Sequence, residues 1–194
     1  MKEKYRKLAE NGISSERLIL RKFKYSDLED YYDFSKCRDI ANMAGWKAHT
    51  DINESMRKIR NILNETNKAS FVIADKETDE FIGTISFMPD ERKKLKDALE
   101  LGYSIKKEWQ GNGYAKEAVC ALMKELFLYY GTEEITAYCF LDNVKSINLL
   151  KEIGFTEEKI YKKTYKTYNG KLRDEQSFSL NNTDFRRMFH VEHS

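Results

Sequence analysis

The chain has 194 residues, of which 41% are hydrophobic and 13% aromatic, and this composition excludes a disordered polypeptide. Its 34 basic and 32 acidic residues leave a formal net charge of +2, so charge gives no argument for binding nucleic acid or a membrane. No apolar run approaches the roughly 20 residues that cross a bilayer, and the first residues do not lead into a signal-peptide core.

The three cysteines indicate the redox state of the protein's environment. Cys37, Cys120 and Cys139 form no CxxC pair and no even set. This pattern favours reduced, buried thiols in a cytoplasmic protein and gives no metal site.

The first quarter of the chain predicts a short leader and then a strand. Residues 1–13 are polar and weakly periodic, and we expect a loosely ordered leader followed by a single domain over residues 14–194. Residues 16–23 contain branched apolar side chains in mixed alternation, which is typical of a strand.

Two helices follow, each with a capping signal. Ser26 stands three residues before Glu29, a capping box that predicts a helix extending to about Asp39. Asp51 caps a second helix, whose apolar residues recur at helical spacing.

The middle and the end of the chain predict strands interrupted by two more helices. The expected elements are strands over 71–74, 81–87 and 99–105, a helix from Ala115, a strand over 134–140, a helix from Asn143 to Gly154, and a hairpin from Phe155 through Asn169-Gly170 to Leu180. The charged residues 90–97 are expected to form a solvated hairpin loop. This order predicts an α/β (α+β) protein built on a largely antiparallel sheet.

The turn between the strand over 99–105 and the helix from Ala115 contains the residues that indicate a binding site. Gly111 and Gly113 allow the main chain to approach an anion closely, because no Cβ intrudes. The free amides and the positive end of the helix dipole favour phosphate oxygens. Two interpretations fit the glycines: a pyrophosphate cradle, or an ordinary tight turn.

We compared this turn with the sequence patterns of known phosphate-binding loops. The Walker pattern fails because Tyr114 and Ala115 follow Gly113, and the dinucleotide pattern fails because Lys116 replaces its third glycine. The turn resembles the Q/R-x-x-G-x-G/A signature of the GCN5-related N-acetyltransferase (GNAT) superfamily, matched by Gln110, Gly113 and Ala115.

Three more segments resemble this superfamily in the same order. Residues 16–21, with Asp27 following, resemble the opening of its RimJ/RimL-like branch; residues 142–155 resemble its N-x-x-S-x-x-L-x-x-x-G-F segment; and residues 169–180 resemble its closing hairpin. The resemblance implies the GNAT fold, a mixed, mostly antiparallel sheet of about seven strands flanked by about four helices.

The resemblance also implies a reaction. Members transfer an acetyl group directly from acetyl-CoA to a primary amine, and here the acceptor is expected to be a protein N-terminal amine of the ribosomal-protein type. A small amine, such as a polyamine or an aminoglycoside, is the alternative, and a non-catalytic CoA-binding regulatory domain is a third interpretation. A monomer and a homodimer both fit, and no nucleic acid or membrane partner is expected.

Site residues follow from the matched positions. The resemblance implies that the cofactor-binding residues are Tyr103, Ile105, Gln110, Gly111, Asn112, Gly113, Tyr114, Ala115, Lys116, Asn143 and Ser146. The backbone N–H of Ile105 is the expected donor to the thioester oxygen as it gains charge. Asn143 is also a preferred N-cap residue, so capping alone would explain it.

Acid–base roles are the least determined. Glu100 is the expected general base, with an exposed strand residue as the alternative and His49 as the reserve. Many relatives carry a tyrosine as general acid where this chain has Leu150, so Ser146 or a water that it holds is left to assist the departing thiol. Trp46 and His49 lie in a connector that is expected to line the substrate site or to seal the core.

Overall fold

The structure is a computed structural model that describes residues 3–93 and 97–190. It divides into two compact units, residues 1–88 with 102–122, and residues 89–101 with 123–194. Strand β5 (Ala98–Ile105) and helix α5 (Tyr114–Leu128) each contribute residues to both units. We describe each unit by itself.

The first unit contains most of the helices. Its elements are α1 (Glu3–Asn11), β1 (Ile13–Ser14), β2 (Leu18–Arg21), the 3-10 turn η1 (Tyr25–Asp27), α2 (Leu28–Ser35), α3 (Arg38–Ala44), α4 (Ile52–Asn64), β3 (Ala69–Asp75), β4 (Phe81–Pro89) and the 3-10 turn η2 (Lys107–Trp109), with the parts of β5 and α5 given above. Strands β1 to β4 pair in sequence order, and β1–β2, β2–β3 and β3–β4 are antiparallel.

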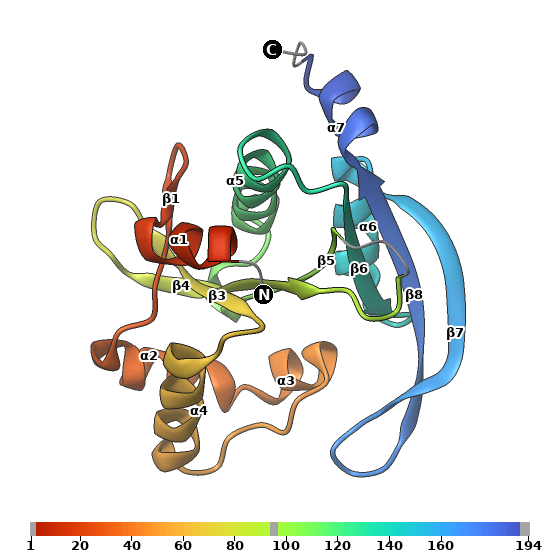
Figure 1. Cartoon of the computed structure of the whole chain (residues 1–194). Coiled ribbons are helices and arrows are strands. Elements are labelled where there is room, and N and C mark those ends of the chain that lie inside the picture. The colour runs from red at the N-terminus through yellow and green to blue at the C-terminus, as the bar shows by residue number, and fades with distance from the viewer. Residues whose placement is uncertain (1–2, 94–96, 191–194) are drawn as a thin grey trace. The chain divides into compact units, whose positions relative to one another are not determined.

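Both faces of this sheet are covered, as Figure 1 shows, with α1 on one side of β3 and β4 and α2, α3 and α4 on the other. Residues alternate between the faces because successive strand side chains point in opposite directions. Val72 and Ala74 pack in a buried cluster with Phe34 of α2. Phe87 instead meets Tyr5 of α1, with ring centroids 5.5 Å apart.

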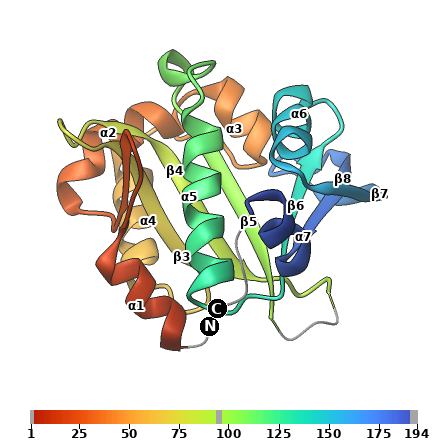
Figure 2. The ribbon, with the colours of Figure 1, turned by 90° about the horizontal axis from the view of Figure 1, so that it is seen from above.

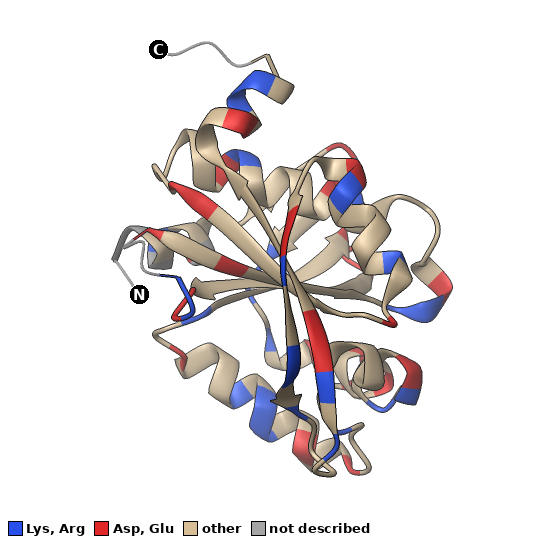
Figure 3. Cartoon of the chain, turned by 90° about the vertical axis from the view of Figure 1, so that its right-hand side faces the viewer, with Lys and Arg blue, Asp and Glu red and all other residues tan. Residues whose placement is uncertain are grey.

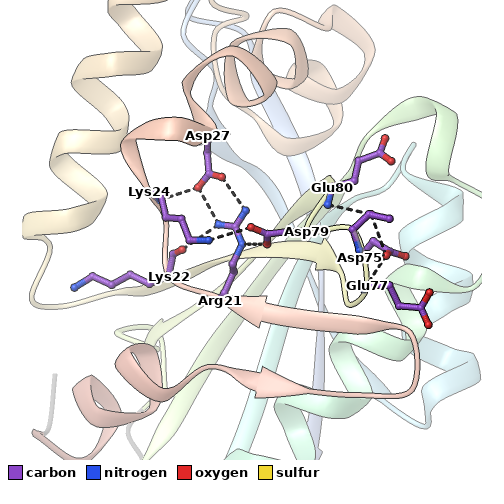
Figure 4. A network of polar contacts seen from close by, with 9 residues as sticks. Arg21, Lys22, Lys24, Asp27, Asp75, Glu77, Asp79 and Glu80 are labelled. Carbon is purple, nitrogen blue, oxygen red and sulfur yellow. Dashed lines mark hydrogen bonds and ion pairs between the residues drawn. The ribbon is translucent and has the colours of Figure 1, made fainter.

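A polar network fixes the end of β2 (Figure 4). Arg21 is bound in a two-pronged ion pair to Asp27 and also pairs with Asp79, whose carboxylate accepts from Lys24 as well. Asp27 in turn accepts a hydrogen bond from the Lys24 backbone N–H at 2.7 Å. The expected helix from a Ser26 cap to about Asp39 was therefore wrong at both ends. A 3-10 turn capped by Asp27 comes first, α2 then covers Leu28–Ser35, and a separate helix, α3, begins at Arg38.

The second unit contains β6 (Glu134–Phe140), α6 (Val144–Ile153), β7 (Thr156–Lys166), β8 (Leu172–Asn181) and α7 (Asn182–Met188). Residues 98–101 of β5 pair with β6 in parallel, and β6 pairs with β8 and β8 with β7 in antiparallel register. Figure 2 shows α6 and α7 beside the strands of this unit.

The two faces of the second unit's strands differ in chemistry. Ile135, Ala137 and Cys139 alternate along β6 with Thr136 and Tyr138, and all but Tyr138 are buried. Cys139 faces α6, where its Sγ lies 3.2 Å from Ser146 Oγ. The opposite face is polar, and Glu100 shares it because Glu100 lies in register with Thr136.

The whole strand order is β1-β2-β3-β4-β5-β6-β8-β7, and it confirms the predicted mixed, mostly antiparallel α/β class. The strand beyond the expected seven is the two-residue β1. In place of the expected loose leader, residues 3–11 form α1, with Tyr5 and Leu8 each 2% exposed; residues 1–2 lie outside the described part. A single domain over residues 14–194 stays a prediction.

The loop between β4 and β5 also differs from the expected solvated hairpin loop over residues 90–97. Residues 94–96 of that loop lie outside the described part. Asp90 is not solvated but buried. Its Oδ2 accepts hydrogen bonds from Thr136 at 2.6 Å and Tyr138 at 2.8 Å, and its Oδ1 accepts from the Arg92 backbone N–H. These bonds raise the cost of ionising the phenol, so burial and Asp90 together raise the pKa of Tyr138.

Charge and hydropathy patterns agree with the composition. In Figure 3 basic and acidic residues are interspersed over the strands and helices. Over residues 3–93 and 97–190, we find no helix with the length and apolar character required to traverse a bilayer. In the same ranges, His, Cys, Asp and Glu residues form no group able to hold a metal ion.

Candidate active site

The glycine turn lies between η2 and α5 and has the backbone that its sequence requires. Gly111 and Gly113 have φ values of +84° and +81°, which side-chain-bearing residues rarely adopt. A Cβ at Gly111 would meet nothing within 4 Å, so the main chain borders open space there. Residues 111–113 are all exposed.

The helix that follows provides the anion-binding end. Its first backbone bond runs from the Glu117 N–H to the Gly113 carbonyl at 3.0 Å. The amides of Tyr114 and Ala115 precede that bond, so they have no carbonyl partner within the helix. Free amides and the positive end of a helix dipole favour an anion.

Polar side chains of the signature hold the turn itself. Gln110 Nε2 donates to the Ile105 carbonyl at 3.1 Å, and Asn112 Nδ2 donates to the Trp109 carbonyl at 3.3 Å. Trp109 packs edge to face on Tyr114, with ring centroids 5.3 Å apart. Two of the predicted cofactor-binding residues therefore stabilise the loop through internal bonds.

Strand β5 carries Tyr103 and Ile105 up to this turn. Tyr103 is half-buried and Ile105 is buried. Gly83 of β4 lies so close that a Cβ there would be 2.3 Å from the Ser104 carbonyl oxygen and 3.0 Å from the Ile105 Cα. The main chain at Ile105, the expected donor to the thioester oxygen, is thus held by close contact with β4.

Glu100 lies on the part of β5 that belongs to the second unit. Its side chain is half-buried, and its role as general base stays a prediction. Arg92 is its charged neighbour: burial alone would lower the pKa of the Arg92 guanidinium, but the carboxylates of Glu175 and Glu100 raise it. Arg92 bonds Glu175 directly at 3.2 Å and stacks 4.1 Å from the Tyr138 ring centre.

Asn143 and Ser146 lie together at the start of α6. Asn143 Oδ1 accepts from the Ser146 backbone N–H at 3.3 Å, so Asn143 is an N-cap residue in fact. Ser146 is half-buried and its hydroxyl meets the Cys139 thiol. Burial raises the pKa of that thiol to about 11, which makes Cys139 a poor nucleophile at neutral pH.

Leu150 occupies the position where many relatives have a tyrosine. Its side chain is fully buried, with 0% exposed. It packs in the second unit and offers no proton.

Trp46 and His49 belong to the first unit and contact its aromatic cluster. Trp46 lies 5.7 Å from Phe34, ring centre to ring centre, and its buried Nε1 has no hydrogen-bond partner among the described residues. His49 Nδ1 lies 2.7 Å from Ser55 Oγ, and its ring meets Tyr31. Burial lowers the pKa of His49, so its imidazole is neutral at pH 7.

The predicted residues fall into two groups. The first unit contains Tyr103, Ile105, the turn over residues 110–116, Trp46 and His49; the second contains Glu100, Asn143 and Ser146. The structure brings the turn and the end of β5 together through Gln110, and Asn143 and Ser146 together through the cap.

Two residues beside the turn were missed by the sequence reasoning. Arg17, at the start of β2, forms an ion pair with Glu117 in the first turn of α5 at 2.7 Å. Arg17 belongs to the opening motif over residues 16–21, and its acidic partner follows the glycine turn directly. Nothing local to either residue could have paired them.

Comparison with known proteins agrees with this geometry. Residues 17–156 match the sequence model of the family described as Acetyltransferase (GNAT) domain. The chain is 29% identical over 171 residues to the uncharacterized N-acetyltransferase p20 of Bacillus licheniformis, covering 87% of this chain and 94% of that protein. It is 28% identical over 190 residues to the ribosomal protein uS5-alanine N-acetyltransferase of Escherichia coli (strain K12), covering 89% and 92%.

Solved structures show the same fold at lower identity. The acetyltransferase (GNAT family) from Bacillus anthracis superimposes with a TM-score of 0.78 at 22% identity, covering 89% of this chain and 99% of that one. The spermidine N-acetyltransferase from Vibrio cholerae, in complex with CoA and spermine, superimposes with a TM-score of 0.75 at 20% identity, covering 88% and 99%.

A glycine turn at a helix start, on this sheet and with this family match, defines an acyltransferase of the GNAT class. The chain belongs to the Acetyltransferase (GNAT) domain family. It is an N-acetyltransferase, and its acetyl donor is acetyl-CoA.

Proposed function

We propose that this enzyme acetylates the N-terminal amine of a protein. The observation that carries the proposal is the glycine turn joined to β5, the strand that also holds the half-buried Glu100. The E. coli relative that is named for a ribosomal protein alanine supports an N-terminal acceptor. We also propose that it works in the cytoplasm, where its free cysteines stay reduced.

The acceptor's chemistry fits a single carboxylate base. The amine must be neutral to attack, and an α-amino group has a pKa of roughly 7.7–8.0, against about 10.4 for lysine. A useful fraction of α-amines is therefore neutral at pH 7. Glu100 accepts the proton that the amine loses, directly or through water.

The remaining roles concern the donor, which supplies the activated acetyl thioester. The Ile105 N–H donates to the thioester oxygen as negative charge grows there. Tyr103 and Ile105 pair through their main chain with the extended arm of the donor, as an added strand would. The turn over residues 110–116 holds the diphosphate, and Asn143 and Ser146 hold the end that departs.

No general acid is needed for the departing sulfur. A thiol with a pKa near 8.5 leaves tolerably as the anion. Ser146, or a water that it binds, assists this step. Leu150 takes no part beyond packing.

A small polycationic amine is the second candidate acceptor. The observation that favours it is the arrangement in the second unit, where the carboxylates of both Glu175 and Glu100 act on one guanidinium, that of Arg92. Arg92 carries one positive charge against the negative charges of these two carboxylates. Negative charge would attract an ammonium group.

One assay separates the candidates. Thiol release from acetyl-CoA is followed with three acceptors: an alanine-initiated peptide, the same peptide with a blocked N-terminus and a free lysine, and spermidine. We expect release with the first alone. Release with spermidine alone would overturn the protein acceptor, and CoA binding without release to any amine would make the chain a regulatory CoA-binding domain.

A further inference from the structure

Glu117, an acidic residue close to the glycine turn, is enclosed by donors. Glu117 lies in the first turn of α5, with 16% of its side chain exposed. Its Oε1 accepts from Ser15 Oγ at 2.8 Å and from the Arg17 backbone N–H at 2.7 Å, and its Oε2 accepts from Arg17 Nε at 2.7 Å. This carboxylate is thus directed toward the start of β2.

The same guanidinium also contacts the turn. Arg17 NH1 donates to the Asn112 carbonyl at 3.2 Å, and the guanidinium carbon lies 4.4 Å from the centre of the Tyr114 ring. A Cβ on Gly113 would be 3.5 Å from Arg17 NH2. One arginine therefore contacts two residues of the turn, Asn112 and Tyr114, while it is bound to the helix that the turn opens.

The electrostatic consequence is specific to an anion site. A carboxylate in the first turn of a helix interacts favourably with the helix dipole, but it repels a diphosphate bound at the same end. The Arg17 charge cancels that repulsion. The hydrogen bond to Glu117 raises the pKa of Arg17. Burial opposes ionisation of Glu117, but the hydrogen bonds that it accepts from Arg17 and Ser15 lower its pKa. Both groups therefore stay ionised at neutral pH.

We propose that Arg17 and Glu117 are positioning residues for acetyl-CoA: their ion pair fixes the glycine turn to the start of β2 and neutralises a carboxylate in the first turn of the helix that the glycine turn opens. The inference rests on the proposed role of residues 110–116 as the diphosphate cradle. It assigns a binding function to this ion pair. The alternative is that the pair only links α5 to the start of β2.

The experiment compares donors with and without the diphosphate. CoA binding is measured by calorimetry, and kcat and KM are measured with acetyl-CoA and with acetyl-pantetheine, which lacks the diphosphate. The variants are Arg17→Gln, Glu117→Gln and the double variant. Lys36→Gln is the matched control, because it removes one positive charge from another ion pair of the first unit, that with Asp33.

We expect Arg17→Gln to weaken CoA binding and raise KM for acetyl-CoA about tenfold, the scale of a charged hydrogen bond, with kcat unchanged. Its kcat/KM for acetyl-pantetheine should match wild type. The double variant should recover part of the lost affinity, because it removes the repelling carboxylate as well. Lys36→Gln should bind CoA as wild type does.

Four results would overturn the proposal. CoA affinity within twofold of wild type in Arg17→Gln would show that the pair does not position the turn. An equal loss with acetyl-pantetheine, or a double variant no better than Arg17→Gln, would leave the pair a structural link. If wild-type protein binds no CoA, the proposed cradle fails first and the positioning role falls with it.

Discussion

Arg21 and Asp27 face each other through two parallel hydrogen bonds, NH2 to Oδ1 at 2.8 Å and NH1 to Oδ2 at 3.0 Å, with only 10% and 6% of their side chains exposed. Figure 4 shows this pair between β2 and the turn before α2. It is a buried, bidentate ion pair, and removing Asp27 leaves the desolvated Arg21 guanidinium with Asp79 as its remaining carboxylate partner.

Asp27→Asn should therefore lower the free energy of unfolding by about 3 kcal/mol. Urea denaturation at neutral pH measures the change. Asp33→Asn is the control, because Asp33 pairs with Lys36 in solvent, where such pairs contribute no more than about 1 kcal/mol. Equal losses in the two variants would contradict the distinction between buried and exposed pairs.

Gly113→Val should abolish CoA binding while the protein stays folded. The change forces a β-branched residue to φ near +81° and puts side-chain atoms over the amides of the turn. Gly170→Val is a matched control, because Gly170 has φ +82° in the β7–β8 turn and a Cβ there would meet nothing within 4 Å. Both variants should lose similar stability on heating, and calorimetry should find CoA binding only in the control.

Glu100→Gln should lower kcat at pH 7 by roughly 10²-fold, the lower end of what general bases contribute. Part of the loss should return at alkaline pH, where more of the amine is already neutral. The measurement is kcat against pH for wild type and variant, with Glu157→Gln, an exposed residue of β7, as control. Superimposable pH profiles would remove Glu100 from the role of base.

Ser146→Ala should reduce kcat by much less than the roughly 10²-fold that loss of a general acid causes. The reason is that the departing thiolate needs little protonation and Ser146 only assists it. Steady-state rates with acetyl-CoA at saturating acceptor test this. Complete inactivity of a folded Ser146→Ala protein would mark the hydroxyl as indispensable.

His49 should make the fold sensitive to mild acid. Its pKa is about 6.5 in the unfolded chain and is lowered by burial in the folded protein, so below pH 6.5 the unfolded state binds the proton more readily. The free energy of unfolding should thus fall between pH 7 and 5.5, and fall less in His49→Asn. Urea midpoints across that range would refute the idea if both proteins lose stability in parallel.

The parts of the site that depend on local geometry could be predicted from the sequence. Gly111 and Gly113 signal their turn because only glycine takes these φ values without strain. Asp51 and Asn143 accept the backbone bonds that their cap positions require. Strand β6 has the bounds expected for it, because a short branched run between turns is a strong local pattern.

Features that depend on distant residues could not be predicted. Arg17 and Glu117 are separated by 100 positions, and the sequence around each one predicts only a solvated charge. Asp90 stands in a run of charges, yet partners on β6 make it a buried acceptor. Helix α1 is polar by composition, and its burial depends on Phe87 of β4, far along the chain.

Gly83 makes one position of β4 intolerant of any replacement. Even a methyl group there would collide with the carbonyl oxygen of Ser104, and the peptide that carries the Ile105 amide would have to move with it. A random mutagenesis screen for activity should therefore return inactive clones at codon 83, although that residue has no side chain to contact either reactant.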